Sequence, residues 1–191
     1  MTVEEEKRRL RELLGRRVRE LAPDERSRGD AAVCRVILRL EAYRRASQVL
    51  AYRALPDEVD IGEVVEHAWG AGKRVFLPVM DPGGGLTFRC WQQGEQLVRS
   101  DFGVEVPPGG EGPAAEPSIV CVPGRGFDRR GRRLGRGRGC YDRASEFLAT
   151  LGPTVGVGYS CQVVDELPYQ EHDRPVDLLV TERGLLWASR G

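Results

Sequence analysis

The segment Ile119–Val122 constrains the fold most strongly, because all of its side chains are apolar. A strand without a polar side chain on either face has to be covered on both faces, which is typical of a central strand in a parallel sheet. A long loop rich in glycine and arginine follows, and residues from about Tyr141 to Leu151 then show a helical pattern. Strand, loop and helix in this order predict an α/β fold.

The rest of the chain repeats this alternation of helices and strands. Thr2 and Glu5 form a capping-box pattern at the start of one predicted helix, and Pro23 marks the start of a second. Asp60 and Glu63 predict a capping box at the start of a third helix. Further strands are predicted at residues 48–52, 75–79, 86–90, 155–159 and 178–180.

Composition supports one folded domain over residues 1–191. Hydrophobic residues make up 40% of the chain and charged residues 30%, as in a globular protein rather than a disordered one. No internal repeat and no long linker divides the sequence. We therefore predict a three-layer sandwich in which helices cover both faces of a largely parallel central sheet.

Charge and cysteine usage narrow the class of function. The formal net charge is zero, which gives no argument for binding to nucleic acid or to a membrane surface. No run approaches the roughly 20 apolar residues that a membrane span needs. The five cysteines contain no C-x-x-C pair, which argues against a disulfide framework and against a structural zinc site. An acidic start at Glu4–Glu6 is unlike a signal peptide, so we expect a cytosolic protein.

The loop Gly131–Asp142 carries the most informative pattern for function. Glycines at every second position let backbone N–H groups turn inward and approach an anion, and the helix that follows adds its positive N-terminal end. Arg136 and Arg138 are suited to clamping phosphate oxygens with paired hydrogen bonds. Asp142, in the first turn of the helix, is placed to hold a Mg²⁺ ion that the phosphates share. The loop therefore predicts a site for ATP with Mg²⁺.

The same loop allows two other interpretations. It matches neither G-x-x-x-x-G-K-S/T nor G-x-G-x-x-G, the commonest phosphate-binding motifs. It could be a solvated arginine-rich turn, or a patch that contacts RNA. RNA-binding surfaces usually interleave aromatic side chains with basic ones, and only Phe127 and Tyr141 lie near in sequence. The physics of anion sites favours phosphate binding, and the alternatives stay open at this point.

Several blocks along the chain, in order, carry a resemblance to one enzyme family. The central block comprises Pro123-Gly124, Phe127-Asp128, Gly131, Arg133–Gly137, Gly139, Tyr141 and Asp142. Around it stand Lys7–Arg11, Asp57–Asp60, Phe102–Val104, Glu171–Asp173, Val176-Asp177 and Val180–Glu182. Together they resemble the signature of the 5-formyltetrahydrofolate cyclo-ligase family, also called 5,10-methenyltetrahydrofolate synthetase.

The resemblance implies a fold similar to the sugar-isomerase and CoA-transferase group, together with a reaction that consumes ATP. The family closes 5-formyltetrahydrofolate, or folinate, into 5,10-methenyltetrahydrofolate and releases ADP and phosphate. A formamide oxygen is a poor leaving group, so ATP phosphorylates it before N10 of the folate attacks the activated carbon. The protein mainly has to position the reactants and neutralise charge, which arginines, backbone N–H groups and Mg²⁺ can do.

The resemblance also implies roles by position. For ATP it implies Lys7, Arg11 and the loop residues Gly135, Arg136, Gly137, Arg138, Gly139, Cys140 and Tyr141, of which Arg136, Arg138 and Tyr141 would act in catalysis. For the folate it implies Arg53, Glu58, Arg138, Gly139, Cys140 and Tyr141. For Mg²⁺ it implies Asp142 and Asp173.

Two positions depart from the family pattern. Cys140 stands where the family usually has a tyrosine beside the folate, and Arg125 stands where it usually has an apolar residue such as leucine. Either change could shift the substrate, although neither removes a predicted metal ligand. His172 could act as an acid or base, but a histidine in a surface turn is the plainer interpretation.

Three hypotheses follow. The first is an ATP- and Mg²⁺-dependent cyclo-ligase that acts on folinate, with or without a polyglutamate tail, as a cytoplasmic monomer without nucleic-acid or membrane partners. The second is a relative that keeps the ATP site but has another substrate or none. The third is an RNA-binding module, which predicts RNA affinity that falls steeply with salt and does not respond to Mg·ATP.

Overall fold

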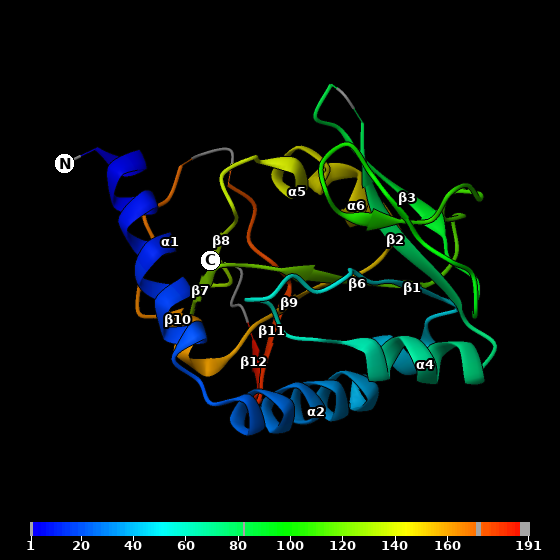
Figure 1. The fold of residues 1–191 in the computed structure, drawn as a ribbon, viewed down its shortest axis with the longest axis horizontal. Coiled ribbons are helices and arrows are strands. Elements are labelled where there is room, and N and C mark those ends of the chain that lie inside the picture. The colour runs from blue at the N-terminus through cyan, green and yellow to red at the C-terminus, as the bar shows by residue number, and fades with distance from the viewer. Residues whose placement is uncertain (1, 82, 171–172, 188–191) are drawn as a thin grey trace.

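A seven-stranded sheet organises the fold of the computed structural model, which describes residues 2–81, 83–170 and 173–187 (Figure 1). Its strands are β1 (Gln48–Leu50), β2 (Arg74–Met80), β3 (Leu86–Cys90), β6 (Ser118–Pro123), β9 (Thr154–Val157), β11 (Leu178–Thr181) and β12 (Gly184–Trp187). They lie in the order β12-β11-β9-β6-β1-β2-β3. The inner strands from β11 to β2 are parallel, and β12 and β3 pair antiparallel at the two edges.

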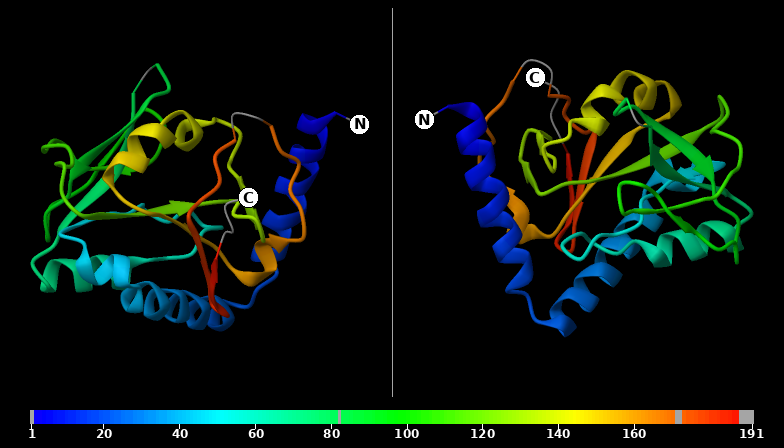
Figure 2. Two further views of the ribbon diagram at one scale, coloured as in Figure 1. Left: turned by 180° about the vertical axis from the view of Figure 1, so that it is seen from behind. Right: turned by 45° about the horizontal axis from the view of Figure 1, so that its top comes forward.

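Helices cover both faces of this sheet, as Figures 1 and 2 show. One face is covered by α2 (Pro23–Arg39), α3 (Glu41–Arg45) and α4 (Gly62–Gly70), and the other by α5 (Cys140–Arg143) and α6 (Ser145–Leu151). Alternate residues of β6 enter the two cores: Ile119 and Cys121 pack on the α2 side, and Val120 and Val122 on the α6 side. β6 is therefore buried on both faces, as its apolar sequence predicts, and each fully buried aliphatic side chain contributes about 1.5–3 kcal/mol.

The first helix, α1 (Val3–Arg19), lies to one side of this sandwich (Figures 1 and 2). It contacts the 3-10 helix η1 (Ser160–Gln162) and the strand β7 (Gly126–Asp128), which forms a small mixed sheet with β8 (Arg133–Leu134) and β10 (Val163–Val164). Leu14 of α1 is fully buried and clusters with Leu134 and Leu167. Because β7 and β8 lie between β6 and α5 in the chain, α1 is docked on the segment that contains the glycine–arginine loop.

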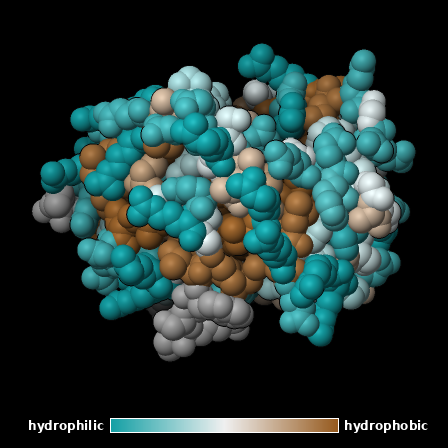
Figure 3. All heavy atoms as spheres, turned by 90° about the horizontal axis from the view of Figure 1, so that it is seen from below, coloured by the Kyte–Doolittle hydropathy of each residue, from teal (hydrophilic) through white to brown (hydrophobic). Residues whose placement is uncertain are grey.

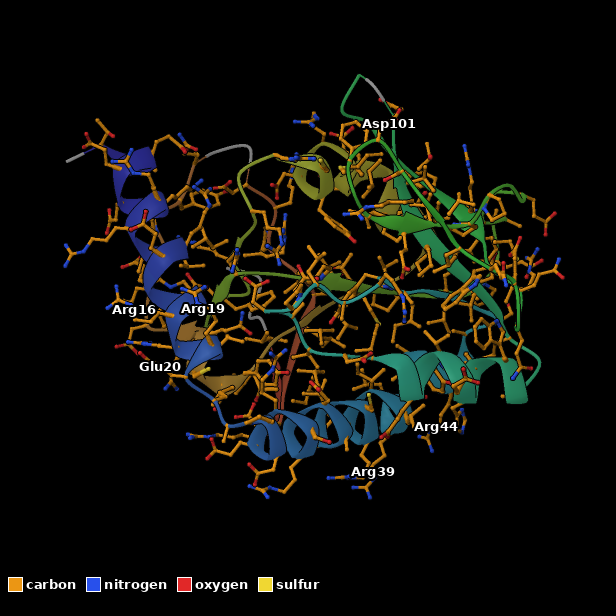
Figure 4. The ribbon with its side chains drawn as sticks, in the orientation of Figure 1. Arg16, Arg19, Glu20, Arg39, Arg44 and Asp101 are labelled. Carbon is orange, nitrogen blue, oxygen red and sulfur yellow. The ribbon has the colours of Figure 1, made fainter. Side chains whose placement is uncertain are left out.

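The outer surface of the layer formed by α2, α3 and α4 is mainly polar. Arg39 and Arg44 are exposed on its outer side (Figure 4). A view from below shows hydrophilic side chains over most of this face, with apolar groups visible between them (Figure 3). Within the residues that the structure describes, no helix combines the length and the apolar character needed to cross a membrane.

The structure confirms the predicted three-layer architecture and both predicted helix starts near the N-terminus. Thr2 Oγ1 accepts a hydrogen bond from the Glu5 N–H at 3.2 Å, and Glu5 Oε2 accepts one from the Thr2 N–H at 2.7 Å. Pro23 is the first residue of α2. The predicted strands are all present and differ only at their ends, where hydrogen bonding frays.

The predicted capping box at the third long helix is wrong. α4 begins at Gly62, and its N-cap residue Ile61 makes no side-chain cap. Asp60 does bind the first turn, because its Oδ1 accepts a hydrogen bond from the Gly62 N–H at 2.8 Å. Glu63 does not form the second, reciprocal bond of a capping box, so the Asp60 carboxylate alone binds the start of this helix.

The single helix predicted for residues 141–151 is also wrong in detail, because the chain is interrupted at Ala144 between α5 and α6. The Ser145 hydroxyl donates a hydrogen bond to the Asp142 carbonyl at 2.7 Å. Such a bond from a side chain to the backbone competes with the regular helical ladder. α5 is consequently one short turn, and the loop lacks the long helix whose positive end the sequence analysis invoked.

Candidate active site

The carboxyl ends of β1, β2 and β6 meet at one edge of the sheet, where ligands usually bind in α/β proteins. A pocket of about 330 Å³ opens there. A small hairpin of β4 (Val98–Arg99) and β5 (Glu105–Val106) covers one side of it. The lining residues include Tyr52, Arg53, Glu58, Pro78, Met80, Leu86, Phe102, Arg133, Gly135, Arg136, Arg138, Gly139, Cys140, Tyr141 and Asp142. All of the residues predicted to bind folate therefore line one pocket.

Glycines set the backbone of the loop that borders this pocket. Gly131, Gly137 and Gly139 have φ angles of 78°, 96° and 62°, in the left-handed region that other residues rarely adopt. Arg11 of α1 lies against the loop, and its Nε donates a hydrogen bond to the Gly135 carbonyl at 2.9 Å. Arg11 and the glycines, predicted together for ATP, are thus brought together by the docking of α1.

A buried carboxylate holds the start of the same segment. Asp128 is fully buried and accepts hydrogen bonds from the backbone N–H groups of Arg130 at 2.8 Å, Arg132 at 3.0 Å and Leu167 at 3.0 Å. These bonds tie the turn after β7 to the chain that follows β10. In the sequence, Asp128 stands out only as part of the family signature. Its role in holding the turn after β7 could not be predicted, because Leu167 is distant in sequence.

Lys7 and Asp173 form a buried ion pair. Lys7 is only 6% exposed, and its Nζ donates to Asp173 Oδ2 at 2.6 Å and to Gln170 Oε1 at 3.1 Å. A residue predicted for ATP and one predicted for Mg²⁺ are therefore in direct contact. Two further residues of this block, Glu171 and His172, lie outside the described residues.

The other predicted metal ligand, Asp142, is paired with an arginine that the sequence analysis did not select. Arg133 Nη2 donates to Asp142 Oδ1 at 2.9 Å, and the Arg133 side chain is only 5% exposed. The guanidinium carbon of Arg133 lies 5.4 Å from the centre of the Tyr141 ring. The signal was present in the signature, where Arg133 lies two residues before Gly135, but arginines are so frequent in this loop that none stood out.

Tyr141 is held as a neutral phenol. Burial raises the pKa of its hydroxyl well above the usual value of 10, and the nearby Glu58 carboxylate raises it further. A phenol with such a pKa carries its proton at neutral pH. Tyr141 can therefore give or accept a hydrogen bond, but it does not supply a phenolate base.

The donor set near the loop suits Mg²⁺ shared with a phosphate ligand. Among the described residues, no group of three or more His, Cys, Asp or Glu side chains is close enough to form a metal site. Mg²⁺ in nucleotide sites usually takes one or two carboxylates and completes its shell with phosphates and water. Asp142 and Asp173 each already face a cationic side chain, so they provide anionic oxygens without forming a cage of their own.

Arg136 is paired with carboxylates on the folate side of the pocket. Its Nε donates to Glu58 Oε1 at 3.0 Å, and its Nη2 contacts Asp57 Oδ1. Asp57 also contacts Arg125 through its other oxygen. Asp57 and Glu58 are each 8% exposed. Two side chains that were predicted for different ligands, Arg136 for phosphate and Glu58 for the pterin, therefore contact each other.

Two more predicted arginines lie at the rim. The Arg138 guanidinium carbon is 5.6 Å from the centre of the Phe102 ring, in the β4–β5 hairpin that also contains Asp101 at its turn (Figure 4). Arg53 Nε donates to Glu105 Oε2 at 3.2 Å. The hairpin thus contacts both arginines, which places it over the pocket mouth.

A second cavity of about 820 Å³ lies on the other side of the Arg133–Asp142 pair, between α6 and the segment that contains Tyr169 and residues 174–177. Arg133, Tyr141 and Asp142 line both cavities. The remaining lining of the larger cavity includes Arg130, Arg132, Tyr169, Arg174 and Asp177. Two ligand-sized spaces therefore share a wall of charged and aromatic side chains.

Cys140 is expected to be the thiol that iodoacetamide labels fastest at pH 8. Its sulfur lies in the pocket, 3.5 Å from the sulfur of Met80. By contrast, Cys34 and Cys121 are fully buried, and burial raises the pKa of each to about 12. At pH 8 roughly one such thiol in ten thousand is a thiolate, the reactive form.

Mass spectrometry of the labelled protein would give the rate at each cysteine. Folinate with Mg·ATP is expected to protect Cys140, whereas Cys161, which lines a separate cavity near η1, serves as the control and should not change. Equal protection of both thiols, or none at Cys140, would contradict the placement of a ligand in the pocket.

Comparisons with known proteins agree on one family. A sequence model of the 5-formyltetrahydrofolate cyclo-ligase family matches residues 3–182. The 5-formyltetrahydrofolate cyclo-ligase of Escherichia coli K12 is 29% identical over 175 residues, covering 88% of this chain and 96% of that protein. The NMR structure of Aquifex aeolicus 5,10-methenyltetrahydrofolate synthetase superposes with a TM-score of 0.81 at 31% identity, covering 97% of this chain and 94% of the other.

A more distant structure supports the fold alone. The 5,10-methenyltetrahydrofolate synthetase of Mycoplasma pneumoniae superposes with a TM-score of 0.71 at 20% identity, over 92% of this chain and 98% of that one. The family match spans both the docked helix α1 and the strands that carry the pocket. The resemblance found in the sequence is confirmed: the chain belongs to the 5-formyltetrahydrofolate cyclo-ligase family, a family of ligases.

Proposed function

We propose that this protein cyclises 5-formyltetrahydrofolate to 5,10-methenyltetrahydrofolate with ATP and Mg²⁺, releasing ADP and phosphate. Family membership supports the reaction class. The observation that carries the proposal is the wall of Arg133, Tyr141 and Asp142 between the two cavities. A phosphoryl group passes between two bound molecules in this reaction, so both have to meet at one set of charge-neutralising side chains.

The smaller pocket suits the folate. Pro78, Met80 and Phe102 give it apolar walls for a flat ring system, and ligand pockets of this kind combine such walls with a few polar groups that fix orientation. The buried Glu58 carboxylate is the polar group suited to accept hydrogen bonds from the N–H groups of a pterin. Cys140, where the family usually has tyrosine, leaves more room beside that ring.

The phosphates of ATP are assigned to the glycine–arginine loop, which leads into the shared wall, and Lys7 and Arg11 would contact them from α1. Lys7 and Arg11 carry the positive charge of α1 toward the loop, and the left-handed glycines let the backbone approach an anion closely. Asp142 and Asp173 would hold Mg²⁺, which would neutralise phosphate charge and orient the γ-phosphoryl group. Arg133 stands behind Asp142 and keeps this carboxylate in place when it is not bound to metal.

The chemistry then needs positioning more than proton transfer. The formyl oxygen attacks the γ-phosphorus, and the bond to ADP breaks. N10 next attacks the formyl carbon, and the carbon–oxygen bond breaks as phosphate leaves with that oxygen and takes up the proton that N10 loses. The neutral Tyr141 phenol is suited to hydrogen-bond the reacting oxygen, and Arg138 at the rim is suited to neutralise the phosphoryl charge as it moves.

The RNA-binding alternative is disfavoured by the pairing of the arginines. Arg133 and Arg136 face carboxylates, and Arg11 faces a backbone carbonyl, so these side chains do not present an open basic surface. All five cysteines lie within the described residues and carry free thiols, which supports a reducing compartment such as the cytosol. The monomeric state remains a prediction.

The test is the absorbance of the methenyltetrahydrofolate band with folinate, run with Mg·ATP and again without it. A rise only in the complete mixture supports the proposal. Mg·ATP binding without any rise would instead support the relative with another substrate. RNA affinity measured at two salt concentrations covers the third hypothesis, which requires strong binding that falls steeply with salt.

A further inference from the structure

Arg125, Asp57, Arg136 and Glu58 form a cluster of two guanidinium groups and two carboxylates beside the pocket. Asp57 contacts Arg125 through Oδ2 and Arg136 through Oδ1. Glu58 contacts Arg136 through Oε1 and accepts a hydrogen bond from the Leu55 N–H at 3.0 Å through Oε2. The formal charges of the cluster therefore cancel, and each carboxylate has a cationic neighbour.

Arg125 is the more buried cation of this cluster, with a side chain that is 21% exposed. Its N–H donates to the Leu134 carbonyl at 2.7 Å, and its own carbonyl accepts a hydrogen bond from Gln162 Nε2 at 3.2 Å. Its guanidinium lies under α1, where a Cβ added at Gly15 would come within 2.9 Å of Nη1. Burial, together with the positive charges of Arg136 and Arg19, lowers the pKa of Arg125 to about 10, so the side chain still carries its charge at neutral pH.

Arg136 is the more exposed cation of the cluster, and it lies in the pocket wall. Its side chain is 33% exposed, and the loop backbone around it passes through the left-handed Gly137. It lines the pocket, whereas Arg125 does not. A phosphate that enters the loop would compete with the carboxylates for this guanidinium, because Arg binds both groups with the same paired geometry.

The charge balance decides whether Arg136 can leave. Removing the cation from a buried carboxylate is strongly unfavourable, because the charge is left without a partner and without water. When Arg136 moves away, Glu58 keeps only the hydrogen bond from the Leu55 N–H, so this part of the cost is the same with or without Arg125. With Arg125 present, Asp57 keeps one guanidinium and adds no second unpaired carboxylate. With an apolar residue at 125, the usual residue in the family, Asp57 would depend on Arg136 alone.

We propose that Arg125 is a positioning residue that keeps Asp57 paired, so that Arg136 can exchange its carboxylate partners for a nucleotide phosphate. The inference rests on the proposed function where it names ATP as the ligand. Its structural basis is the pairing of Asp57 with two guanidinium groups at once.

The experiment compares Mg·ATP binding by calorimetry in the wild type, Arg125→Leu, Asp57→Asn and the double variant. Arg125→Leu is expected to bind Mg·ATP about tenfold more weakly, because Asp57 then holds Arg136 in place. The double variant is expected to recover to within about twofold of the wild type, since only Glu58 then competes for Arg136, as in the wild type. Arg129→Leu, which removes an exposed arginine from the turn after β7, is the matched control and should bind Mg·ATP as the wild type does.

Recovery of Mg·ATP binding in the double variant distinguishes a positioning role of Arg125 from simple damage to the fold. If Arg125→Leu binds Mg·ATP normally, or if Asp57→Asn fails to restore it, the proposal is overturned, and melting temperatures of all variants show whether weaker binding follows unfolding. Absence of Mg·ATP binding by the wild type also overturns it. The predicted pattern of binding in a wild type that forms no methenyl product would keep this inference and reject the proposed reaction.

Discussion

Asp142→Asn is expected to lower the rate of methenyltetrahydrofolate formation by about 10²–10³-fold while leaving the fold intact. Asparagine keeps an oxygen that can accept the hydrogen bond from Arg133 Nη2, which lies 2.9 Å from Asp142 in the native protein. It removes the negative charge that we assign to Mg²⁺. Steady-state rates over a range of Mg²⁺ concentrations would measure the loss, and urea unfolding would confirm that the variant is folded.

Two further variants test whether the lower rate of Asp142→Asn comes from the loss of the negative charge. Asp142→Ala removes the hydrogen bond as well and leaves the nearly buried Arg133 unpaired, so its free energy of unfolding should fall by about 3–5 kcal/mol. Asp165→Asn, at a fully exposed carboxylate that lines neither cavity, is the matched change and should keep the full rate. A full rate in Asp142→Asn would remove this residue from the metal site.

Asp128→Ala is expected to lower the free energy of unfolding by about 3–6 kcal/mol. The Asp128 carboxylate accepts three backbone hydrogen bonds of 2.8–3.0 Å, and alanine would leave the N–H groups of Arg130, Arg132 and Leu167 without this acceptor. Each buried donor left unsatisfied costs about 1–3 kcal/mol. The midpoint of urea unfolding, analysed with a common slope, would measure the change.

A control lies in the same part of the molecule. Asp165→Ala removes a fully exposed carboxylate from the chain that follows β10, and its unfolding midpoint should equal that of the wild type. Asp128→Asn keeps one acceptor oxygen and should fall between the wild type and Asp128→Ala. An alanine variant as stable as Asp165→Ala would show that water replaces the carboxylate and that the turn does not depend on it.

The sheet and the position of the pocket could be predicted from the sequence because they depend on local patterns. The apolar residues of β6 predict a central strand, and the glycine–arginine loop comes after this strand in the chain. The pairing of Arg136 with Glu58 joins residues 78 positions apart, and no local pattern shows which of many arginines turns toward which carboxylate. The same limit hid Arg133, whose importance depends on its burial rather than on its spacing.

The break between α5 and α6 was missed for a different reason. The residues from Tyr141 to Leu151 have a helical pattern of apolar side chains, and the pattern continues through the break. One hydroxyl, that of Ser145, decides the local backbone by bonding to the Asp142 carbonyl. Hydrophobic periodicity records which face is buried, and it is insensitive to such a bond.

The wall shared by the two cavities also has a consequence for inhibition. A compound could join one group that fits the 330 Å³ pocket to a second group that fits the 820 Å³ cavity. Once one group had bound, the linker would hold the other near its own cavity at a high effective concentration. Its linker would have to pass Arg133 and Tyr141, so its affinity would report directly on how far that wall can open. Such a linked ligand would bind more tightly than either of its halves alone, without any new contact.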